Sequence, residues 1–279
     1  MTDFLKKVAL SDSDIALVFD ETSFWSSRFG QLLFEHIEIR PGLRILDLGC
    51  GTGFPLFELA HLFGSSCQVT GIDIWQGALE RARLKLKTYD SPNIEIIEAD
   101  GARQPFPDSE FDLIVSNLGV NNFADPRAVF SECFRVAKPD ARIVLTTNVK
   151  GHYQEFYDVF REALMETNKT EHLERLSANE EHRGTKESIR ETLRGAGWEV
   201  VRVIEDQFRT RFQDGSALLN HHLTRFGFLD GWRGVVGPED ETEVFRVIEK
   251  KLNDAAQKTG GLVMTVPMLY LEGEKSGEK

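Results

Sequence analysis

The sequence has few features of a secreted, membrane-bound or metal-binding protein. Its three cysteines, Cys50, Cys67 and Cys133, are far apart and form no CxxC pair, which argues against a disulfide framework or a zinc site and suits a reducing cytoplasm. No stretch approaches the roughly 20 apolar residues that a membrane-spanning helix needs. Asp12 and Asp14 interrupt the apolar residues near the N-terminus, so no signal peptide is predicted. We therefore expect a cytoplasmic protein without a metal ion or a membrane partner.

Basic residues are also scarce relative to acidic ones. The 279 residues include 33 Lys and Arg against 45 Asp and Glu, which gives a net charge of −12. Such a charge opposes a general attraction to nucleic acid. A chain of this length with 41% hydrophobic residues can form one large packed domain. These properties favour a small molecule as the partner and leave the oligomeric state open.

Short apolar runs alternate with segments of helical periodicity in the first half of the chain. The runs lie at 43–48, 67–74, 93–99, 111–117 and 141–147. They are rich in Ile, Leu and Val on both faces, as strands of a parallel sheet covered by helices are. The alternation predicts an α/β fold, a doubly wound Rossmann-like sheet with helices on both faces.

The predicted strands divide the chain into a core and added segments. We assign residues 1–279 to a single domain, with an N-terminal helical cap at 1–40 and a cofactor-binding core at 41–150. Further strands are predicted at 198–205 and 262–271. Residues 207–260 lie between them and are too many for a hairpin turn, so we interpret this segment as a lid insertion.

One proline affects the prediction for the last strand. Pro267 lies within the final apolar run and cannot donate a backbone hydrogen bond to a neighbouring strand. We therefore expect an edge strand, a bulge or a shorter strand at this point.

Three glycines on alternate positions follow the first predicted strand in the stretch LDLGCGTG. They are Gly49, Gly51 and Gly53. A glycine turn between a strand and a helix presents backbone N–H groups to a ligand at the carboxyl edge of a sheet. The GxGxG spacing differs from the GxGxxG of dinucleotide-binding proteins, and no Lys-Ser/Thr pair follows to form a P-loop. The motif predicts a nucleotide-like ligand that does not need a phosphate.

Acidic residues end the second and third predicted strands. Asp73 lies about twenty residues after the glycines, where a carboxylate can accept hydrogen bonds from both hydroxyls of a ribose. Asp100 lies at the next strand end, where it can accept from an exocyclic amine such as that of adenine. The three strand ends together predict a nucleoside site.

The motifs LDLGCGTG, GIDI, ADGARQPFPDSEFDLIVSN and FRVAKPDARIVLTT resemble those of class I S-adenosylmethionine-dependent methyltransferases. The similarity is strongest to a small-molecule branch that includes quinone-biosynthesis enzymes, and it covers residues 41–147. It implies S-adenosylmethionine as the cofactor and methyl transfer to a small organic molecule by in-line displacement. It also implies a seven-stranded, mostly parallel sheet whose last strand is antiparallel.

By position, the resemblance assigns roles at four strand ends. The methionine part would meet Asp47 and the glycine turn, and the adenine would lie between Ile74 and Ala102. The sulfonium and the methionyl amine would lie beside Asn117 and Leu118. The implied cofactor residues are Asp47, Gly49, Gly51, Gly53, Asp73, Ile74, Asp100, Gly101, Ala102, Asn117 and Leu118. The chain departs from the family in two places, since it has Trp75 where a serine is common and Gln104 where a leucine is common.

Histidines and aromatic residues are candidates for the acceptor side of the site. A hydroxyl acceptor would benefit from a base, and the candidates are His152, His221 and His222. The alternative for each is a surface or packing role. Five aromatic residues are predicted to wall an apolar pocket or, alternatively, to form ordinary core: Phe24, Trp25, Phe212, Phe226 and Trp232.

Two other functions remain open at this point. A nicotinamide-dependent oxidoreductase would share the fold class, although it would be expected to have the longer glycine spacing. A non-catalytic protein would bind S-adenosylmethionine without consuming it. The sequence does not identify the acceptor, the atom that is methylated or the pathway.

Overall fold

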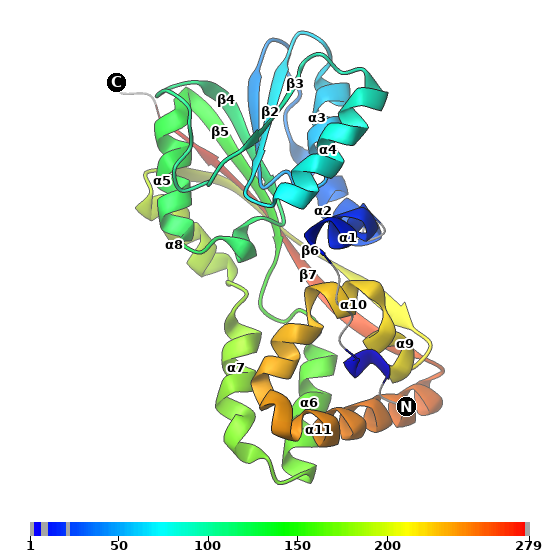
Figure 1. The fold of residues 1–279 in the computed structure, drawn as a ribbon. Helices are drawn as coiled ribbons and strands as arrows, with labels where there is room; N and C mark the ends of the chain where they lie inside the picture. Colours follow the sequence, from blue (N-terminus) through cyan, green and yellow to red (C-terminus); the bar gives the residue numbers. More distant parts are fainter. Residues whose placement is uncertain (1–2, 7–10, 21–22, 277–279) are drawn as a thin grey trace. The chain divides into compact units, whose positions relative to one another are not determined.

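The computed structural model describes the chain except for residues 1–2, 7–10, 21–22 and 277–279 (Figure 1). The chain divides into two compact units. The sheet unit contains Leu10–Thr147, Gly184–Asp206 and Met268–Lys279. The helical unit contains Met1–Ala9, Asn148–Arg183 and Gln207–Pro267. The prediction of a single domain remains a prediction, and the helical unit draws on more of the chain than the expected lid.

The first half of the sheet unit alternates strands and helices as predicted. Its elements are α1 (Asp12–Phe19), α2 (Ser23–His36), β1 (Arg44–Leu48), α3 (Leu56–Phe63), β2 (Gln68–Asp73), α4 (Gln76–Tyr89), β3 (Ile94–Glu98), β4 (Phe111–Asn117), the short 3-10 helix η3 (Val120–Asn122), α5 (Pro126–Val136), β5 (Ala137–Asn148) and α8 (Lys186–Gly195). In Figure 1, α3 and α4 lie beside β2 and β3, while α5 and α8 pack together.

The seven strands form one sheet in the order β3-β2-β1-β4-β5-β7-β6, where β6 is Glu199–Phe212 and β7 is Leu262–Glu274. The pairs β1–β2, β1–β4, β2–β3 and β4–β5 are parallel. The strand order reverses between β1 and β4, and the carboxyl ends of strands at such a reversal form the usual ligand site of an open α/β sheet. The predicted fold class is confirmed.

The last two strands run antiparallel to their neighbours. Between β5 and β7, Asp140 pairs with Lys275, whereas Val149 pairs with the earlier residue Pro267. As residue numbers rise along β5 they fall along β7, which defines an antiparallel pair. The expectation that Pro267 marks an edge or a shortened strand is wrong, because β7 continues through it and lies between β5 and β6. The outer strand at this side of the sheet is β6.

The core of the sheet unit follows from the apolar runs. In β1, the four residues after Arg44 are buried, and Val69, Ile72, Ile114 and Val115 of the neighbouring strands are almost inaccessible. Strands that are buried on both faces need the uniform apolar composition that the sequence shows. The buried strands hold their carboxyl ends rigidly at one edge of the sheet.

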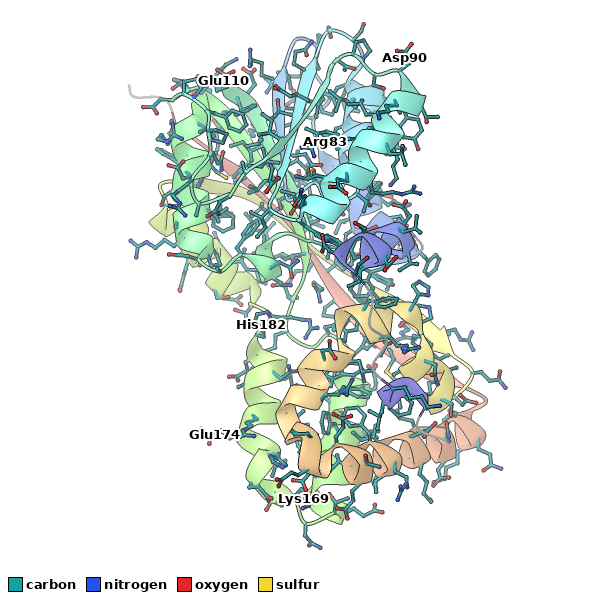
Figure 2. The ribbon with its side chains drawn as sticks, in the orientation of Figure 1. Arg83, Asp90, Glu110, Lys169, Glu174 and His182 are labelled. Atoms are coloured by element: carbon teal, nitrogen blue, oxygen red, sulfur yellow. The ribbon has the colours of Figure 1, made fainter. Side chains whose placement is uncertain are left out.

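The helical unit is built from segments that are far apart in the sequence. Its elements are the 3-10 helices η1 (Asp3–Leu5) and η4 (Thr170–His172), α6 (Gln154–Glu166), α7 (Leu173–Glu181), α9 (Gly215–Asn220), α10 (His222–Gly227) and α11 (Leu229–Thr259). Figure 2 marks Lys169, Glu174 and His182 in this unit. A non-helical residue, Gly237, and the following Pro238 interrupt α11, as expected where a proline removes a helical hydrogen bond.

Several strands are longer than their apolar runs, most of all β5 and β6. β5 begins at Ala137, four residues before the predicted start, and β6 continues to Phe212, into the segment assigned to the lid. Most of β6 is exposed or half-buried, so its polar residues fit a strand at the edge of a sheet. Among the described residues, no helix has the length and apolar character needed to cross a membrane.

Candidate functional site

The glycine turn leaves β1 and folds over the neighbouring strand β2. The N–H groups of Gly49 and Cys50 donate to the carbonyl oxygen of Ile72, at 2.8 and 3.0 Å. Gly49 and Gly51 have positive φ angles of 78° and 51°, which residues with a Cβ atom rarely adopt. A Cβ atom added to Gly51 would meet no described atom within 4 Å. The turn therefore presents its backbone to open space.

Asp73, at the end of β2, connects this turn to the one that follows β2. One carboxylate oxygen accepts from the N–H of Gly51 at 2.9 Å, and the other accepts from the N–H of Trp75 at 2.9 Å. The side chain of Ile74, between them, is 71% exposed. A flat apolar ring placed against Ile74 would remove this surface from water. The turn thus offers a carboxylate and an apolar surface together, as binding of a nucleoside requires.

Asp47 is a fully buried carboxyl group in β1. Among the described residues, no hydrogen-bond partner meets either of its carboxylate oxygens. Burial and the negative charge of Asp73 raise the pKa of Asp47 well above its usual value of 3.8. The nearby backbone N–H of Leu56 offsets this only in part, since it does not make a hydrogen bond of normal geometry to the carboxylate. A buried polar group without a partner is costly, and a cation beside it would favour the ionised form. The site therefore fits a ligand that carries a positive charge.

The end of β4 lies next to β1 in the sheet, since Asp47 is in register with Val115. The Asn117 side-chain oxygen accepts from the Thr146 hydroxyl at 2.7 Å, and the Leu118 N–H donates to the Thr146 carbonyl at 2.7 Å. Leu118 has a positive φ of 67°, an uncommon conformation that the surrounding hydrogen bonds must maintain. Asn117 and Leu118 are held in place at the edge predicted to face the cofactor.

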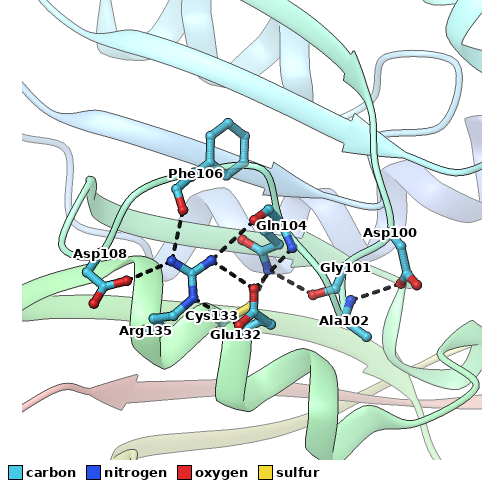
Figure 3. Close-up of polar contacts among 9 residues, drawn as sticks. All are labelled: Asp100, Gly101, Ala102, Gln104, Phe106, Asp108, Glu132, Cys133 and Arg135. Carbon is cyan, nitrogen blue, oxygen red and sulfur yellow. Dashed lines mark hydrogen bonds and ion pairs between the residues drawn. The ribbon is translucent and has the colours of Figure 1, made fainter.

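A polar network fixes the loop after β3 to α5 (Figure 3). The Arg135 guanidinium donates to the carbonyl oxygens of Phe106 and Gln104 and pairs with Asp108 and Glu132. These interactions hold Arg135 protonated and raise its pKa, the hydrogen bond to Glu132 most of all. The network gives the loop a defined shape.

Within this loop, Gln104 explains one departure from the family pattern. It is buried, and its side-chain amide donates to the Gly101 carbonyl at 3.0 Å and to the Cys133 sulfur at 3.4 Å (Figure 3). The Ala102 N–H donates to Asp100 at 2.9 Å. Gln104 therefore supports the segment predicted to contact adenine by hydrogen bonding, where a leucine would support it by packing alone.

The predicted cofactor residues thus lie at the carboxyl ends of β1 to β4, which are neighbours in the sheet. The structure brings these strand ends together at one edge, and the open space at Gly51 and the unpartnered Asp47 fit a cationic nucleoside there. Their contacts with a cofactor stay a prediction.

The three candidate bases lie in the helical unit. His152 is 2% exposed and stacks on Tyr153 at 4.2 Å between ring centres. Burial, with the positive charge of Arg183, lowers the pKa of His152 well below 6.5, so the imidazole is neutral at neutral pH. The rings of His221 and His222 stack with their centres 4.3 Å apart. Burial lowers the pKa of His221, and the neighbouring His222 lowers it further. A neutral imidazole can accept a proton, but the role of each histidine stays a prediction.

The predicted pocket aromatics have different environments. Trp232 is 1% exposed, stacks on Phe156 at 3.8 Å and donates from its indole N–H to the Tyr157 hydroxyl at 3.3 Å. It is an interior residue of the helical unit, as the packing alternative predicts. Phe212 contacts His221 edge-on at 5.4 Å. The pocket role of Trp232 and Phe212 stays a prediction.

Exposed aromatic surface is found elsewhere. Phe226 of the helical unit is 41% exposed, and Phe24 on α2 of the sheet unit is 73% exposed. Trp25, also on α2, lies 5.3 Å from the Phe29 ring. Exposed aromatic residues are candidates for ligand contact, so Phe24 and Phe226 remain the more accessible members of the predicted pocket set.

One group of potential metal ligands was not predicted from the sequence. Ligand atoms of Glu171, His172 and Asp240 lie within 4.8 Å of one another. Asp240 already pairs with the Lys169 ammonium at 2.6 Å and with His172 at 2.8 Å. Because the Lys169 ammonium supplies a positive charge, these contacts form an internal ion-pair network.

Comparison with known proteins matches the part of the chain that contains the ends of β1 to β4. A family model described as a methyltransferase domain matches residues 39–197. A demethylmenaquinone methyltransferase of Lactococcus lactis is 41% identical over 103 residues, which is 37% of this chain and 41% of that protein. A 2-phytyl-1,4-naphtoquinone methyltransferase of Nostoc is 32% identical over 148 residues, 51% of this chain and 65% of that protein. The chain thus spans between two fifths and two thirds of these relatives.

Solved structures resemble the fold as well. A SAM-dependent methyltransferase of Aquifex aeolicus has a TM-score of 0.54 and 21% sequence identity, covering 70% of this chain and 93% of that one. At this identity the likeness concerns the fold alone. It agrees with the α/β fold described above.

Proposed function

Because the chain belongs to the methyltransferase domain family, we propose that it transfers a methyl group from S-adenosylmethionine to a small organic molecule. The observation that carries this proposal is Asp47, a buried carboxyl group without a described hydrogen-bond partner beside the glycine turn. The methionine part of S-adenosylmethionine carries an ammonium and a sulfonium group. A cation at this point would compensate the buried carboxylate.

The residues at each of the four strand ends would bind a different part of the cofactor. The glycine turn and Asp47 would hold the methionine part, and Asp73 would accept hydrogen bonds from the ribose hydroxyls. Asp73 is already oriented for this by the N–H groups of Gly51 and Trp75. Ile74 and Ala102 would cover the adenine faces, and the remaining acceptor capacity of Asp100 would meet its amine.

S-adenosylmethionine supplies an electrophilic methyl group on a positively charged sulfur. The contribution of the protein is to align the acceptor with this group and to exclude water, since alignment can supply much of the acceleration. Asn117 and Leu118 would fix the region around the reacting methyl group. If the acceptor is a hydroxyl, a base would help, but the burial and the Arg183 charge that lower the pKa of His152 also make it a weaker proton acceptor.

The acceptor class is proposed from the relatives and from the aromatic residues. The two relatives above are named as quinone methyltransferases, so hydroxylated aromatic rings are the first acceptors to test. The helical unit contributes Phe226 and Phe228, which lie in its α10–α11 region, and apolar walls are usual for such ligands. The proposed acceptor class can be wrong without affecting the proposed cofactor.

The setting of the reaction is also a proposal. A net charge of −12 supports an enzyme that acts on a small molecule without nucleic acid. The three widely spaced cysteines support a cytoplasmic setting. The protein is expected to pass through immobilised RNA and DNA at moderate salt. Tight, salt-sensitive retention would contradict this part of the proposal.

Two experiments test the proposed function. Calorimetric titration with S-adenosylmethionine, S-adenosylhomocysteine and NADH is expected to give binding of the first two alone. Binding of NADH alone would favour a nicotinamide-dependent oxidoreductase. Mass spectrometry after incubation with S-adenosylmethionine and a panel of hydroxylated aromatic acceptors is expected to show S-adenosylhomocysteine and a product 14 mass units heavier, about the mass of a CH₂ unit. Binding without turnover of any acceptor would favour a non-catalytic protein.

A further inference from the structure

The N-terminal helix α1 contacts both turns of the candidate cofactor site within the sheet unit. It spans Asp12–Phe19, and Asp20 follows directly as its C-cap residue. Among the described helices of the sheet unit, α1 and α4 form the most extensive helix–helix contact. The two acidic residues at its ends reach different turns.

The first end of α1 contacts the turn after β2. One carboxylate oxygen of Asp12 accepts from the Trp75 indole N–H at 2.5 Å, and the other accepts from the Gly77 N–H at 2.9 Å. The ring of Phe19, the last residue of the helix, meets the Trp75 ring edge-on at 5.1 Å. Trp75 is also the residue whose N–H donates to Asp73. Asp12 therefore fixes the residue that orients the predicted ribose acceptor.

Close approach at this end depends on a glycine. A Cβ atom added to Gly77 would lie 2.5 Å from the Asp12 carboxylate and 3.0 Å from its backbone oxygen. Backbone atoms cannot move aside as a flexible side chain can. Gly77 therefore allows α1 to dock at the N-terminal end of α4.

The second end of α1 contacts the glycine turn after β1. The Thr52 hydroxyl donates to Asp20 at 3.0 Å, and Arg81 donates to Asp20 at 3.0 Å. Lys85 also binds Asp20, and its ammonium donates to the Thr52 carbonyl oxygen at 2.9 Å. Thr52 lies between Gly51 and Gly53 and is thus held through both its side chain and its backbone.

The charges at this second end reinforce one another. Burial opposes ionisation of Asp20, but hydrogen bonds from Lys85 and Arg81 outweigh it, and the pKa of Asp20 is lowered. All three side chains are about one quarter exposed, so the network is less screened than a surface ion pair. A charge network of this kind fixes geometry as well as stability.

We propose that Asp12 and Asp20 are positioning residues for the cofactor, because α1 ties the turn after β1 to the turn after β2 and holds both in the binding geometry. This inference rests on the proposed function, in which those two turns carry the methionine and ribose contacts. Neither acid touches the reacting atoms. By linkage, the docking of α1 and the binding of S-adenosylmethionine strengthen each other.

The test compares variants at the two ends of α1 with a matched control on α4. Asp20→Asn, Asp12→Asn and Gly77→Ala each weaken one end, whereas Glu80→Gln removes an exposed acid of α4 that has no described partner. Calorimetry is expected to show S-adenosylmethionine binding about tenfold weaker in the three variants, the loss typical of a charge-assisted hydrogen bond. The control is expected to stay within about twofold.

A second readout separates positioning from general stabilisation. Hydrogen exchange of amides 12–19 is expected to slow when S-adenosylmethionine binds the wild type, and to respond less in Asp20→Asn. Asp20→Glu, which keeps the charge, is expected to recover most of the affinity. If one variant fails to fold, the other two still report on the proposal.

The outcomes distinguish this inference from the proposed function. If the wild type binds no S-adenosylmethionine, the proposed function fails and this inference fails with it. If the wild type binds and folded variants bind equally well, with no change in exchange of amides 12–19, only the positioning role of α1 is overturned. Weaker binding in Asp12→Asn, Asp20→Asn and Gly77→Ala but not in Glu80→Gln supports it.

Discussion

Two acidic side chains, Asp47 of the sheet unit and Asp240 of the helical unit, have opposite surroundings. In the sheet unit, Asp47 is buried without a described partner, and Asp73 faces a turn that opens onto free space. In the helical unit, the buried Trp232 and Tyr157 satisfy one another, and Asp240 is paired with Lys169 and His172. An incomplete polar group marks a place for a ligand, whereas a satisfied one stabilises the fold. The comparison favours Asp47 as a ligand-binding group, as proposed above, and a packing role for the Trp232 cluster.

The largest effect is expected at the interior of the helical unit. Trp232→Ala removes the ring that stacks on Phe156 and is expected to lower the free energy of unfolding by about 3–5 kcal/mol. Chemical denaturation measures this cost. If the variant is folded, its affinity for S-adenosylmethionine is expected to stay within about threefold of the wild type. A folded variant that lost the cofactor would place Trp232 in the cofactor site and break the comparison.

A smaller loss is expected at the ribose position. Asp73→Ala removes a carboxylate that would accept charge-assisted hydrogen bonds, so the binding free energy of S-adenosylmethionine is expected to weaken by about 1.5–3 kcal/mol. Asp90→Asn is the matched control, since Asp90 is exposed at the end of α4 (Figure 2) and asparagine tolerates its left-handed backbone. Calorimetry compares the two. Unchanged affinity in Asp73→Ala would remove Asp73 from the site.

The pH dependence of stability sharpens the account of Asp47. Its pKa is raised in the folded protein, so the native state binds a proton more tightly than the unfolded state. Stability is therefore expected to be full below the unfolded pKa of about 3.8 and to fall as the pH rises toward the folded pKa. In Asp47→Asn, which has no carboxyl group to ionise at this position, the free energy of unfolding is expected to fall less over the same pH range. Identical pH profiles for the two proteins would show that Asp47 is not a buried, proton-binding group.

The smallest effect on stability is expected at the exposed aromatic Phe226. Because this ring is 41% exposed, Phe226→Ala is expected to change the free energy of unfolding by within about 0.5 kcal/mol. If Phe226 contacts the acceptor, turnover is expected to fall while S-adenosylmethionine affinity stays within about threefold, since methyl transfer depends on acceptor alignment. Steady-state kinetics with an identified acceptor measures the effect. Normal turnover would remove Phe226 from the predicted pocket.

The sheet unit could be predicted well because its signals are local. The runs at 43–48 and 67–74 correspond to β1 and β2 within one residue at each end, since strands buried on both faces have a continuous apolar composition. β6 extended beyond its apolar run because an edge strand tolerates polar residues on its exposed face. Pro267 was misread because a proline interferes with only one backbone donor, and the neighbouring residues of β7 still pair.

The helical unit and α1 could not be predicted in the same way. The unit combines residues 1–9, 148–183 and 207–267, and periodicity within one segment does not reveal which distant segment it packs against. Asp12 and Asp20 belong to no recognisable sequence motif, and only their contacts with Trp75 and Thr52 connect them to the site. The nearest sequence signal was Trp75 itself, which replaces the small residue common in the family.

The most direct test of the central claim is a calorimetric titration of S-adenosylmethionine into the wild type and Asp47→Asn at several pH values in buffers of different ionisation enthalpy. The account predicts that the cationic ligand ionises Asp47, so wild-type binding releases protons and strengthens with rising pH, by up to about tenfold per pH unit below the raised pKa. Asp47→Asn is expected to bind more weakly and to show little of this proton release. Equal affinity and equal proton release in the two proteins would contradict the claim that the buried carboxyl group of the sheet unit is completed by the cofactor.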